Sequence, residues 1–364
     1  MWLLSVAMII VPALFALIIH NYLRHGDLST KRKVIFFFVY LVLINVITLL
    51  ICRIRGMDKI YFFDTTFSFQ LKYFGLGGVL GFIVPFLVCL VTEEQITIGG
   101  FKRYITRFIH DMCKYMQYAI CSARADLHAE VASSYLNWMW WLIEPMCMML
   151  IYTFIFGIVF NAREEYFPVF IFIGITMWSF FSRNVSASVN IVTANKGIIT
   201  KIYMPKFILL LSKMLVNGFK MLVSFGVILL MMVVFRVPVS IHIFAAIPIL
   251  IVLFLFTFGV GTILMHYGVF VNDLAYITGI VLTMLMYFTG TFYSISKRIP
   301  APFGEIIEMC NPVAFLISSM RNALLYGETL ALPVLLLWTG ISIILIALGA
   351  FTIYSNENAY VKVI

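Results

Sequence analysis

The amino-acid sequence contains a series of long apolar runs, and these runs limit what the chain can fold into. Nine of them occur, at residues 2–20, 34–52, 73–92, 138–160, 167–190, 207–235, 243–266, 275–295 and 332–355. About 20 helical residues cross the ~30 Å hydrocarbon core of a bilayer, and no run shows the period-two alternation of barrel strands. Only 11% of the residues are charged, against roughly 25% in soluble domains. The sequence therefore predicts an all-α polytopic membrane protein with nine spans.

The Lys and Arg residues predict the orientation of these spans. With the C-terminus in the cytoplasm, the cytoplasmic loops and tail carry 13 Lys or Arg residues and the outer loops carry nine. The positive-inside rule favours this arrangement, although the outer loop 53–72 carries four of the nine. A cleaved signal peptide is the alternative for residues 2–20, but no basic residue precedes the run and no small-residue cleavage site follows it. We therefore expect a retained helix.

The net charge and the cysteines exclude several other classes. The charge of +9 is scattered over short loops, which favours a membrane surface over nucleic acid as its partner. The six cysteines form no CxxC motif, and no histidine stands at metal-ligand spacing. Neither a disulfide framework nor a metal site is predicted, and we expect this chain to bind no cofactor of its own.

The longest polar stretch, residues 93–137, separates two parts of the chain. Gly99 and Gly100 mark a boundary, and apolar residues recur at helical spacing from Phe101 onward while basic residues occupy other positions. Such a basic amphipathic helix lies along the inner membrane surface. We expect three parts: a three-helix membrane extension at 1–100, an interfacial gate-helix region at 101–137 and a six-helix membrane domain at 138–364.

A tryptophan cluster opens the fourth predicted span. Trp138, Trp140 and Trp141 lie where the chain becomes apolar, and Glu144 and Pro145 follow one turn later. An interfacial belt is the simplest interpretation of the tryptophans, since their rings favour the headgroup level. It leaves Glu144 unexplained, because a carboxylate inside a span costs about 2.5–3.5 kcal/mol and usually faces protein or water. Pro145 removes a backbone donor and tends to kink the helix.

Four stretches of the chain together carry a family resemblance. They are the run from Ser134 to Gly157, then GITMWSFFSRNVSASVNIVTANKGIITKIYMPKFIL, GVFVNDLAYITGIVLTMLMYFTGTFYSISKRIP and NPVAFLISSMRNALLYGE. In order and spacing they resemble the permease domain of ABC-2 type polysaccharide exporters, over roughly residues 112–356. Members of that family move O-antigen, capsular polysaccharide or teichoic acid chains on lipid carriers. The chain departs from the family pattern at Asn137, Glu144 and Asn272, where glycine, asparagine and arginine are usual, and the first hundred residues are not covered.

The resemblance implies a permease subunit of an ABC exporter in the cytoplasmic membrane, which translocates a lipid-linked polysaccharide. It also implies a homodimer of this chain and two copies of a separate cytoplasmic ATPase. The sequence has no GxxxxGK[ST] loop, so ATP and Mg are expected in that partner, and this chain is expected to be a transport subunit without enzymatic activity.

Residues 191–206 are the expected coupling segment, in which apolar residues fill a groove of the ATPase while the lysines stay solvated. The alternative is a basic loop that serves only topology. The residues assigned to coupling are Asn195, Lys196, Ile198, Ile199, Lys201 and Tyr203.

Two further sets of residues are assigned through the resemblance. The gate, where the substrate is admitted from the inner membrane surface, comprises the amphipathic helix together with Trp138, Trp140, Trp141, Glu144 and Pro145. Aromatic faces suit a sliding sugar polymer, and lipid-facing rings are the alternative. The candidates for this glycan channel are Tyr152, Phe156, Phe160, Phe167, Phe170, Tyr287, Phe288, Phe292 and Tyr293.

Three basic residues interrupt predicted spans. Arg183 and Lys220 are functional candidates, since a charge at that depth could meet the diphosphate of a lipid carrier. Lys213 lies nearer a helix end, where a lysine can extend to the interface. The stretch 296–331 is too polar to span, and Asn311-Pro312 is predicted to break it into two short helices held against protein.

Two other functions remain as alternatives. One is ABC-2 export of a drug or another small molecule. The other is a multi-span acyl- or glycosyltransferase acting on lipid-linked sugar, which needs clustered carboxylates or a histidine pair. The acidic pairs Glu93-Glu94 and Glu164-Glu165 are adjacent residues in loops, and His110 and His128 lie 18 residues apart.

Overall fold

The computed structural model describes residues 2–23, 30–54, 77, 81, 84, 98–132, 135–159, 164–238, 240–271, 273–300, 303–357 and 360. Every regular element within these residues is a helix, which confirms the all-α prediction. The chain divides into two compact units, Met1–Phe101 with Ile299–Cys310, and Lys102–Arg298 with Asn311–Ile364. We refer to them as unit 1 and unit 2.

Unit 2 contains the long apolar helices. They are α5 (Trp140–Tyr152), which continues as the π-helix η2 (Thr153–Val159), and then α6 (Phe167–Ala194), α8 (Phe207–Val234), α9 (Ala246–Phe270, preceded by the 3-10 turn η3, Ile241–Ala245) and α14 (Leu332–Ser355). These five are long and apolar enough to cross a membrane, by length and composition, among the residues that the structure describes. The predicted third span, 73–92, lies almost wholly outside those residues, so the count of nine stays a prediction.

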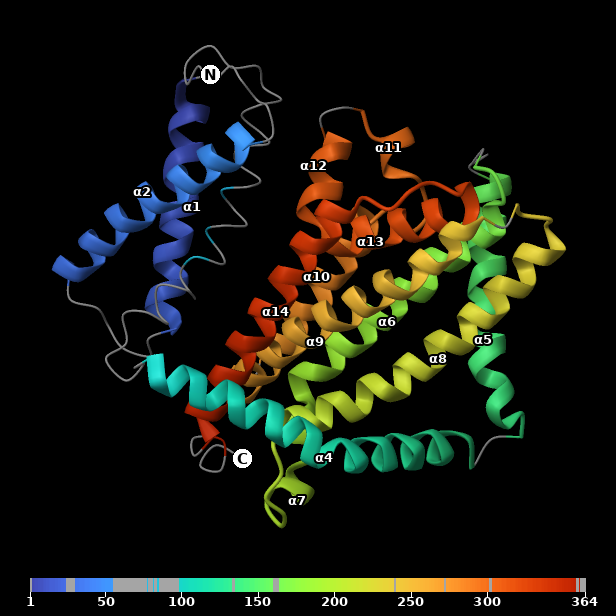
Figure 1. The fold of residues 1–364 in the computed structure, drawn as a ribbon, viewed down its shortest axis with the longest axis horizontal. Coiled ribbons are helices and arrows are strands. Elements are labelled where there is room, and N and C mark those ends of the chain that lie inside the picture. Colours follow the sequence, from blue (N-terminus) through green and yellow to red (C-terminus); the bar gives the residue numbers. More distant parts are fainter. Residues whose placement is uncertain are drawn as a thin grey trace. The chain divides into compact units, whose positions relative to one another are not determined.

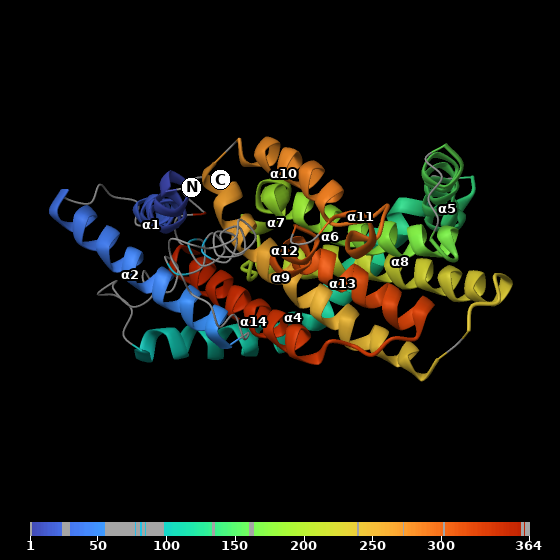
Figure 2. The same ribbon diagram turned by 90° about the horizontal axis from the view of Figure 1, so that it is seen from above.

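The helix α6 forms the centre of unit 2. It contacts α5, α8, α9 and α10. In its most apolar stretch of 18 residues, 72% of the residues are buried, against 6% in the stretch Trp140–Gly157 of α5 and η2. Figures 1 and 2 show α5 at one edge of unit 2 and α14 on the far side of α9. Close helix packing relies on glycine: a Cβ on Gly268 of α9 would overlap the backbone oxygen of Val189 in α6. Small residues thus allow α6 and α9 to approach closely.

The helix α10 (Leu274–Phe288) is shorter than its predicted span, 275–295. Its 15 residues rise about 22 Å, less than the bilayer core. The chain turns after Phe288 because Gly290 adopts a φ of 66°, the left-handed conformation that commonly ends a helix. The buried guanidinium of Arg321 donates to the carbonyl oxygens of Gly290 (2.7 Å) and Thr291 (2.6 Å) and so satisfies groups at this helix end.

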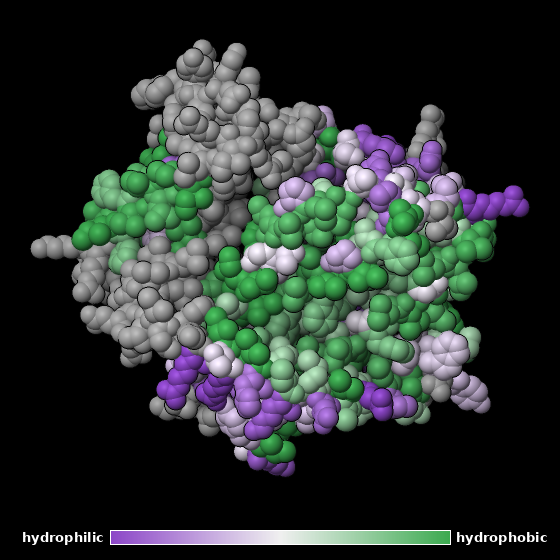
Figure 3. All heavy atoms as spheres, viewed as in Figure 1, coloured by the Kyte–Doolittle hydropathy of each residue, from purple (hydrophilic) through white to green (hydrophobic). Residues whose placement is uncertain are grey.

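The predicted amphipathic helix is present as α4 (Ile98–Ala132). Tyr104, Phe108 and Met112 pack against the core of unit 2, whereas Arg103 and Lys114 are exposed. Within unit 2, α4 lies across one end of the bundle, and the short helix α7 (Lys196–Ile199) extends beyond that end (Figure 1). Figure 3 shows a broad apolar band over unit 2 with hydrophilic side chains gathered at both ends, as expected for a protein that crosses a bilayer.

The opposite end of the bundle contains short helices. They are α11 (Ile295–Arg298), α13 (Pro312–Arg321) and the π-helix η4 (Asn322–Tyr326), whereas the short helix α12 (Phe303–Cys310) belongs to unit 1. The predicted break at Asn311-Pro312 is confirmed: the Asn311 Oδ1 atom accepts hydrogen bonds from the backbone N–H groups of Val313 (3.1 Å) and Ala314 (3.3 Å). Asn311 is therefore the N-cap of α13, with proline in the first turn, where it fits best.

Unit 1 contains α1 (Trp2–Leu23) and α2 (Thr30–Ile54), which pack against each other. Ala13 and Ala16 of α1 and Tyr40 and Ile44 of α2 are buried in its core. The Tyr40 hydroxyl is hydrogen-bonded to the Nδ1 atom of His20 over 2.5 Å. A buried polar contact of this kind fixes how α1 and α2 pair.

Candidate functional site

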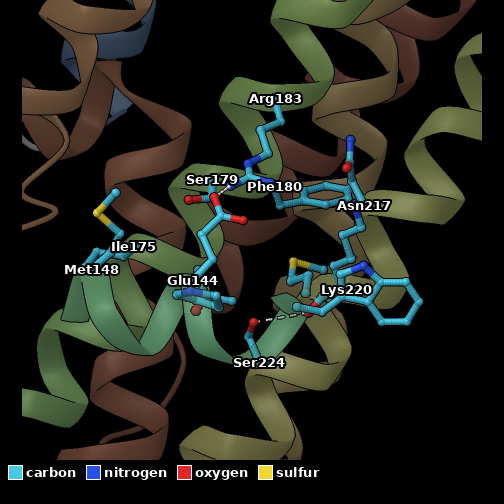
Figure 4. A pocket seen from close by; sticks show the side chains of 13 residues that line it. Glu144, Met148, Ile175, Ser179, Phe180, Arg183, Asn217, Lys220 and Ser224 are labelled. Carbon is cyan, nitrogen blue, oxygen red and sulfur yellow. Dashed lines mark hydrogen bonds and ion pairs between the residues drawn. The ribbon is translucent and has the colours of Figure 1, made fainter. Parts of the chain in front are cut away.

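A cleft between α5, α6 and α8 gathers polar side chains among apolar helix faces. It has a volume of about 90 Å³. Figure 4 shows Glu144, Arg183, Ser179, Asn217, Lys220 and Ser224 around it. Charged groups within membrane-spanning helices are costly unless they are paired or hydrated, and they commonly mark functional sites.

Both cations of the cleft are paired with carboxylates. The Nη2 atom of Arg183 lies 2.6 Å from Oε1 of Glu144, so the pair joins α6 to α5 (Figure 4). The Nζ atom of Lys220 contacts Oε2 of Glu130 on α4, and Lys213 lies 4.0 Å from the same carboxylate. Lys213 is thus an ion-pair partner of Glu130. Glu130 was not among the predicted residues, because it lies 90 positions from Lys220 and only the fold brings the two together.

A larger groove lies next to the cleft, between α4, α8 and the start of α5. It has a volume of about 780 Å³ and is lined mainly by apolar side chains, with Arg124 and His128 contributing polar ends. Trp138 and Trp141 line it, and the Trp141 ring meets Phe219 edge-on at a centroid distance of 5.7 Å. Trp140 is exposed. Pro145 lies inside α5, on the wall of the smaller cleft. Four of the five predicted gate residues, all except Trp140, therefore line the cleft, the groove or both.

A buried amide pair that sequence reasoning missed lies at the same level. The Nδ2 atom of Asn217 donates to Oδ1 of Asn184 over 2.7 Å, and Asn184 is fully buried. Asn184 in turn donates to the backbone oxygen of Phe180, also over 2.7 Å. A polar residue in each of two predicted spans was the available signal. The pair links α6 to α8 at the wall of the cleft, which Asn217 lines.

The predicted coupling segment forms an exposed projection of unit 2. Asn195 ends α6, and its Nδ2 atom donates to the backbone oxygen of Ile191 over 2.7 Å. Lys196 and Lys201 are exposed, Ile198 is 39% exposed, and Ile199 packs against the core. Tyr203 follows α7, and its hydroxyl donates to Oε1 of Glu357 over 2.6 Å. The segment therefore exposes the aliphatic residues Ile198 and Ile202 together with two lysines.

The predicted channel aromatics fall into different environments. Tyr152, Phe156 and Phe292 form one cluster: the Phe292 centroid lies 4.6 Å from that of Tyr152 and 4.9 Å from that of Phe156, whose ring is nearly parallel. Two others, Phe167 and Phe170, are buried in the core and offer no free face in this conformation. Phe160 lies outside the described residues.

The remaining channel candidates lie at the end of α10. Tyr287 and Phe288 are more than half exposed, at 57% and 52%. Tyr293 is partly buried, and its hydroxyl donates to the backbone oxygen of Tyr287 over 2.7 Å. No group of three or more His, Cys, Asp or Glu side chains suited to a metal ion occurs among the described residues.

Comparison with known proteins identifies the class. Residues 116–325 match the ABC-2 type transporter family, which covers more than half of the chain. The chain belongs to the ABC-2 type transporter family. This permease is 30% identical over 228 residues to the O-antigen export system permease protein RfbA of Klebsiella pneumoniae, across 62% of the chain and 87% of that protein. It is 24% identical over 247 residues to the RfbA protein of Myxococcus xanthus, across 65% of the chain and 95% of that protein.

Family membership settles the general role of the ABC-2 permease. It is a multi-pass protein of the inner membrane and the transport subunit of an ABC exporter, and ATP is hydrolysed by a separate ATPase subunit. The matched region contains the cleft, the coupling segment and most of unit 2. Helices α1 and α2 precede the match.

Proposed function

We propose that this ABC-2 permease exports a lipid-linked polysaccharide of the O-antigen, capsule or teichoic acid type across the cytoplasmic membrane. The observation that carries the proposal is the similarity to RfbA permeases, which extends over nearly the whole length of those proteins. These relatives are named as permeases of O-antigen export systems. Export of a drug or another small molecule, and transferase chemistry, have no comparable support.

The charged cleft and the neighbouring groove suit the two ends of a lipid carrier. Arg183 and Lys220 are the cations that would meet its phosphates, which compete with Glu144 and Glu130 for them. The apolar groove beside Trp138 and Trp141 would receive part of its hydrocarbon chain. In this proposal α4, the tryptophans and the Glu144-Pro145 turn form the gate at which the substrate is admitted.

The energy for transport enters through the coupling segment. We assign contacts with the ATPase to Asn195, Lys196, Ile198, Ile199 and Lys201, with Ile198 as the exposed apolar contact. Tyr203 was predicted with this set, but its hydroxyl donates to Glu357, so we assign it a role within the permease. The complete exporter in this proposal has two copies of the permease and two of the ATPase, which holds ATP and Mg. The exposed apolar side chains of Leu150 and Ile151 on α5 and Phe154 on η2 support a contact with a second copy or with lipid.

Sugar rings would pass along aromatic side chains toward the outer face. Tyr287 and Phe288 are the exposed candidates, and Tyr152 and Phe156 are partly exposed. Aromatic faces provide apolar contact without a fixed hydrogen-bond pattern, so a polymer of many units can slide past them. We leave Phe167, Phe170 and Phe292 out of the glycan channel, because they are buried within the protomer.

Deletion of the gene tests the proposed substrate. We expect surface polysaccharide to disappear, lipid-linked glycan to accumulate inside the cell, and drug susceptibility to stay at the parental level. Re-expression of the chain should restore the surface polymer, while a strain with an inactivated ATPase serves as the control. Normal surface polysaccharide together with increased drug susceptibility would support small-molecule export instead.

A further inference from the structure

A cluster of polar side chains connects three parts of unit 2 that are far apart in sequence: α4, the segment between α7 and α8, and the end of α14. It comprises Arg107 and Asp111 of α4, Tyr203 and Lys206 between α7 and α8, and Tyr354 and Glu357 at the end of α14. We call these six residues the junction. Its four charged members are two cations and two carboxylates, so it is neutral as a whole.

Glu357 is the centre of the junction. Its carboxylate accepts a hydrogen bond from the Tyr203 hydroxyl over 2.6 Å and another from Nη2 of Arg107 over 3.1 Å. The Nζ atom of Lys206, which is almost fully buried, lies 3.6 Å from the same group. One side chain at the end of α14 therefore contacts α4, the coupling segment and the start of α8.

Arg107 makes the second set of connections. Its guanidinium contacts the Tyr203 hydroxyl, lies 3.7 Å from Oδ2 of Asp111, and covers the Tyr354 ring at 4.6 Å from the ring centroid. The Tyr354 hydroxyl donates to Asp111 over 2.7 Å in a buried contact. Partial burial and the hydrogen bond to Glu357 raise the pKa of Tyr203 to about 12, which is the direction expected for a hydroxyl that donates to a carboxylate.

The chain between α7 and α8 has little backbone stiffness, in contrast to the link from α6 to α7, where the backbone oxygen of Asn195 accepts hydrogen bonds from Ile198 and Ile199. Residues 200–206 form turns and irregular structure between α7 and α8. If α7 moved, residues 200–206 could change conformation without moving α8, unless side-chain contacts connect them to a neighbouring helix. In the junction, Lys206, Asp111 and Glu357 have low exposure, whereas Arg107 and Tyr203 lie at the surface. A carboxylate with low exposure needs its donors, so removing one partner of Glu357 weakens the defined geometry of the junction.

We propose that Tyr203, Arg107 and Glu357 are positioning residues that transmit movement of the coupling segment to α4 and to the end of α14. This inference rests on the proposed function, since it assumes that the ATPase acts on residues 195–203. It goes further by naming the contacts that connect the ATPase to the gate helix.

Hydrogen–deuterium exchange on the permease–ATPase complex tests this link without any glycan. In the wild type we expect ATP to change exchange both at residues 195–203 and at 102–132 of α4. In Tyr203→Phe and Glu357→Gln the change at 195–203 should persist, and the change at α4 should fall about fivefold or more, the size of an ordinary coupling free energy. Tyr276→Phe, at an exposed tyrosine of α10, is the matched control and should behave as the wild type.

A double variant separates transmission from two independent effects. The effect of Tyr203→Phe combined with Glu357→Gln should be smaller than the sum of the two single effects, because both changes act on the Tyr203–Glu357 contact. A wild-type response at α4 in both single variants would overturn the inference while leaving the proposed coupling site intact. Loss of the ATPase from the variant complexes would overturn it too, since the residues would then serve docking. If ATP leaves 195–203 of the wild type unchanged, the coupling site itself fails, and the inference fails with it.

Discussion

At the scale of the residue, single side chains in unit 2 supply hydrogen bonds to buried backbone groups. Arg321 is 3% exposed, and it donates to the backbone oxygens of Phe170, Gly290 and Thr291 through three different nitrogens. Gly174 leaves the space for it: a Cβ there would lie 2.6 Å from the Thr291 oxygen and would also overlap the guanidinium. The rigid donor fork of arginine suits this set of acceptors, which a lysine ammonium does not reproduce.

We therefore predict that Arg321→Lys lowers the thermal stability of the purified permease. Each carbonyl left without a donor costs roughly 1–3 kcal/mol. Arg298→Lys, at an exposed position of α11, is the control and should leave the melting temperature unchanged. The measurement is the unfolding midpoint in detergent. Equal midpoints for the two variants would show that Arg321 has no such role.

The Glu144–Arg183 pair leads to a prediction with opposite signs for its two members. If phosphates compete with Glu144 for the guanidinium, Glu144→Gln should strengthen binding of lipid-linked glycan and Arg183→Gln should weaken it. The measurement is the glycan concentration that gives half-maximal stimulation of ATP hydrolysis. Shifts in the same direction would indicate that the pair only connects α5 to α6.

At the scale of elements, the packing of α6 against α9 depends on a residue without a side chain. Gly268 faces the backbone of Val189, whereas Gly279 on α10 has no atom within 4 Å of an added Cβ. We predict that Gly268→Ala destabilises the permease by about 1–3 kcal/mol, the usual effect of overpacking. Gly279→Ala should be neutral or slightly stabilising. The unfolding midpoints of the two variants provide the comparison, and a stable Gly268→Ala protein would contradict the close approach.

Much of this element-level structure could be predicted from the sequence. The spans that became α6, α8, α9 and α14 were recognisable because each is a long run of apolar residues, and the helix start at Pro312 followed from an Asn-Pro pair. The end of α10 was not recognisable, because it depends on Gly290 and on an arginine 31 residues away.

The candidate site was less predictable than the fold. Arg183, Lys220 and Glu144 stood out as charges within apolar runs, but their partners are set by tertiary contacts. Nothing in the local sequence indicates that Glu357 reaches Tyr203, which lies 154 residues earlier. Burial of Phe167 and Phe170 was hidden for a similar reason, since apolar aromatic residues look alike whether they face protein, lipid or a channel.

At the scale of the whole molecule, in our proposal the ATPase binds the exposed coupling segment. We predict that Ile198→Gln weakens co-purification of the ATPase, because Ile198 is the exposed apolar residue of α7. Ile241→Gln places the same change at an exposed isoleucine of η3 and is the control. Equal recovery of the ATPase with both variants would remove α7 from the contact.

The central claim is that this permease couples ATP hydrolysis to the movement of a lipid-linked glycan. The most direct test is the rate of ATP hydrolysis by the permease–ATPase complex in lipid nanodiscs, with and without purified lipid-linked glycan. We predict that the glycan raises the rate, and that Ile198→Gln abolishes the increase. A rate that is indifferent to the glycan, in a complex that assembles and hydrolyses ATP, would contradict the claim.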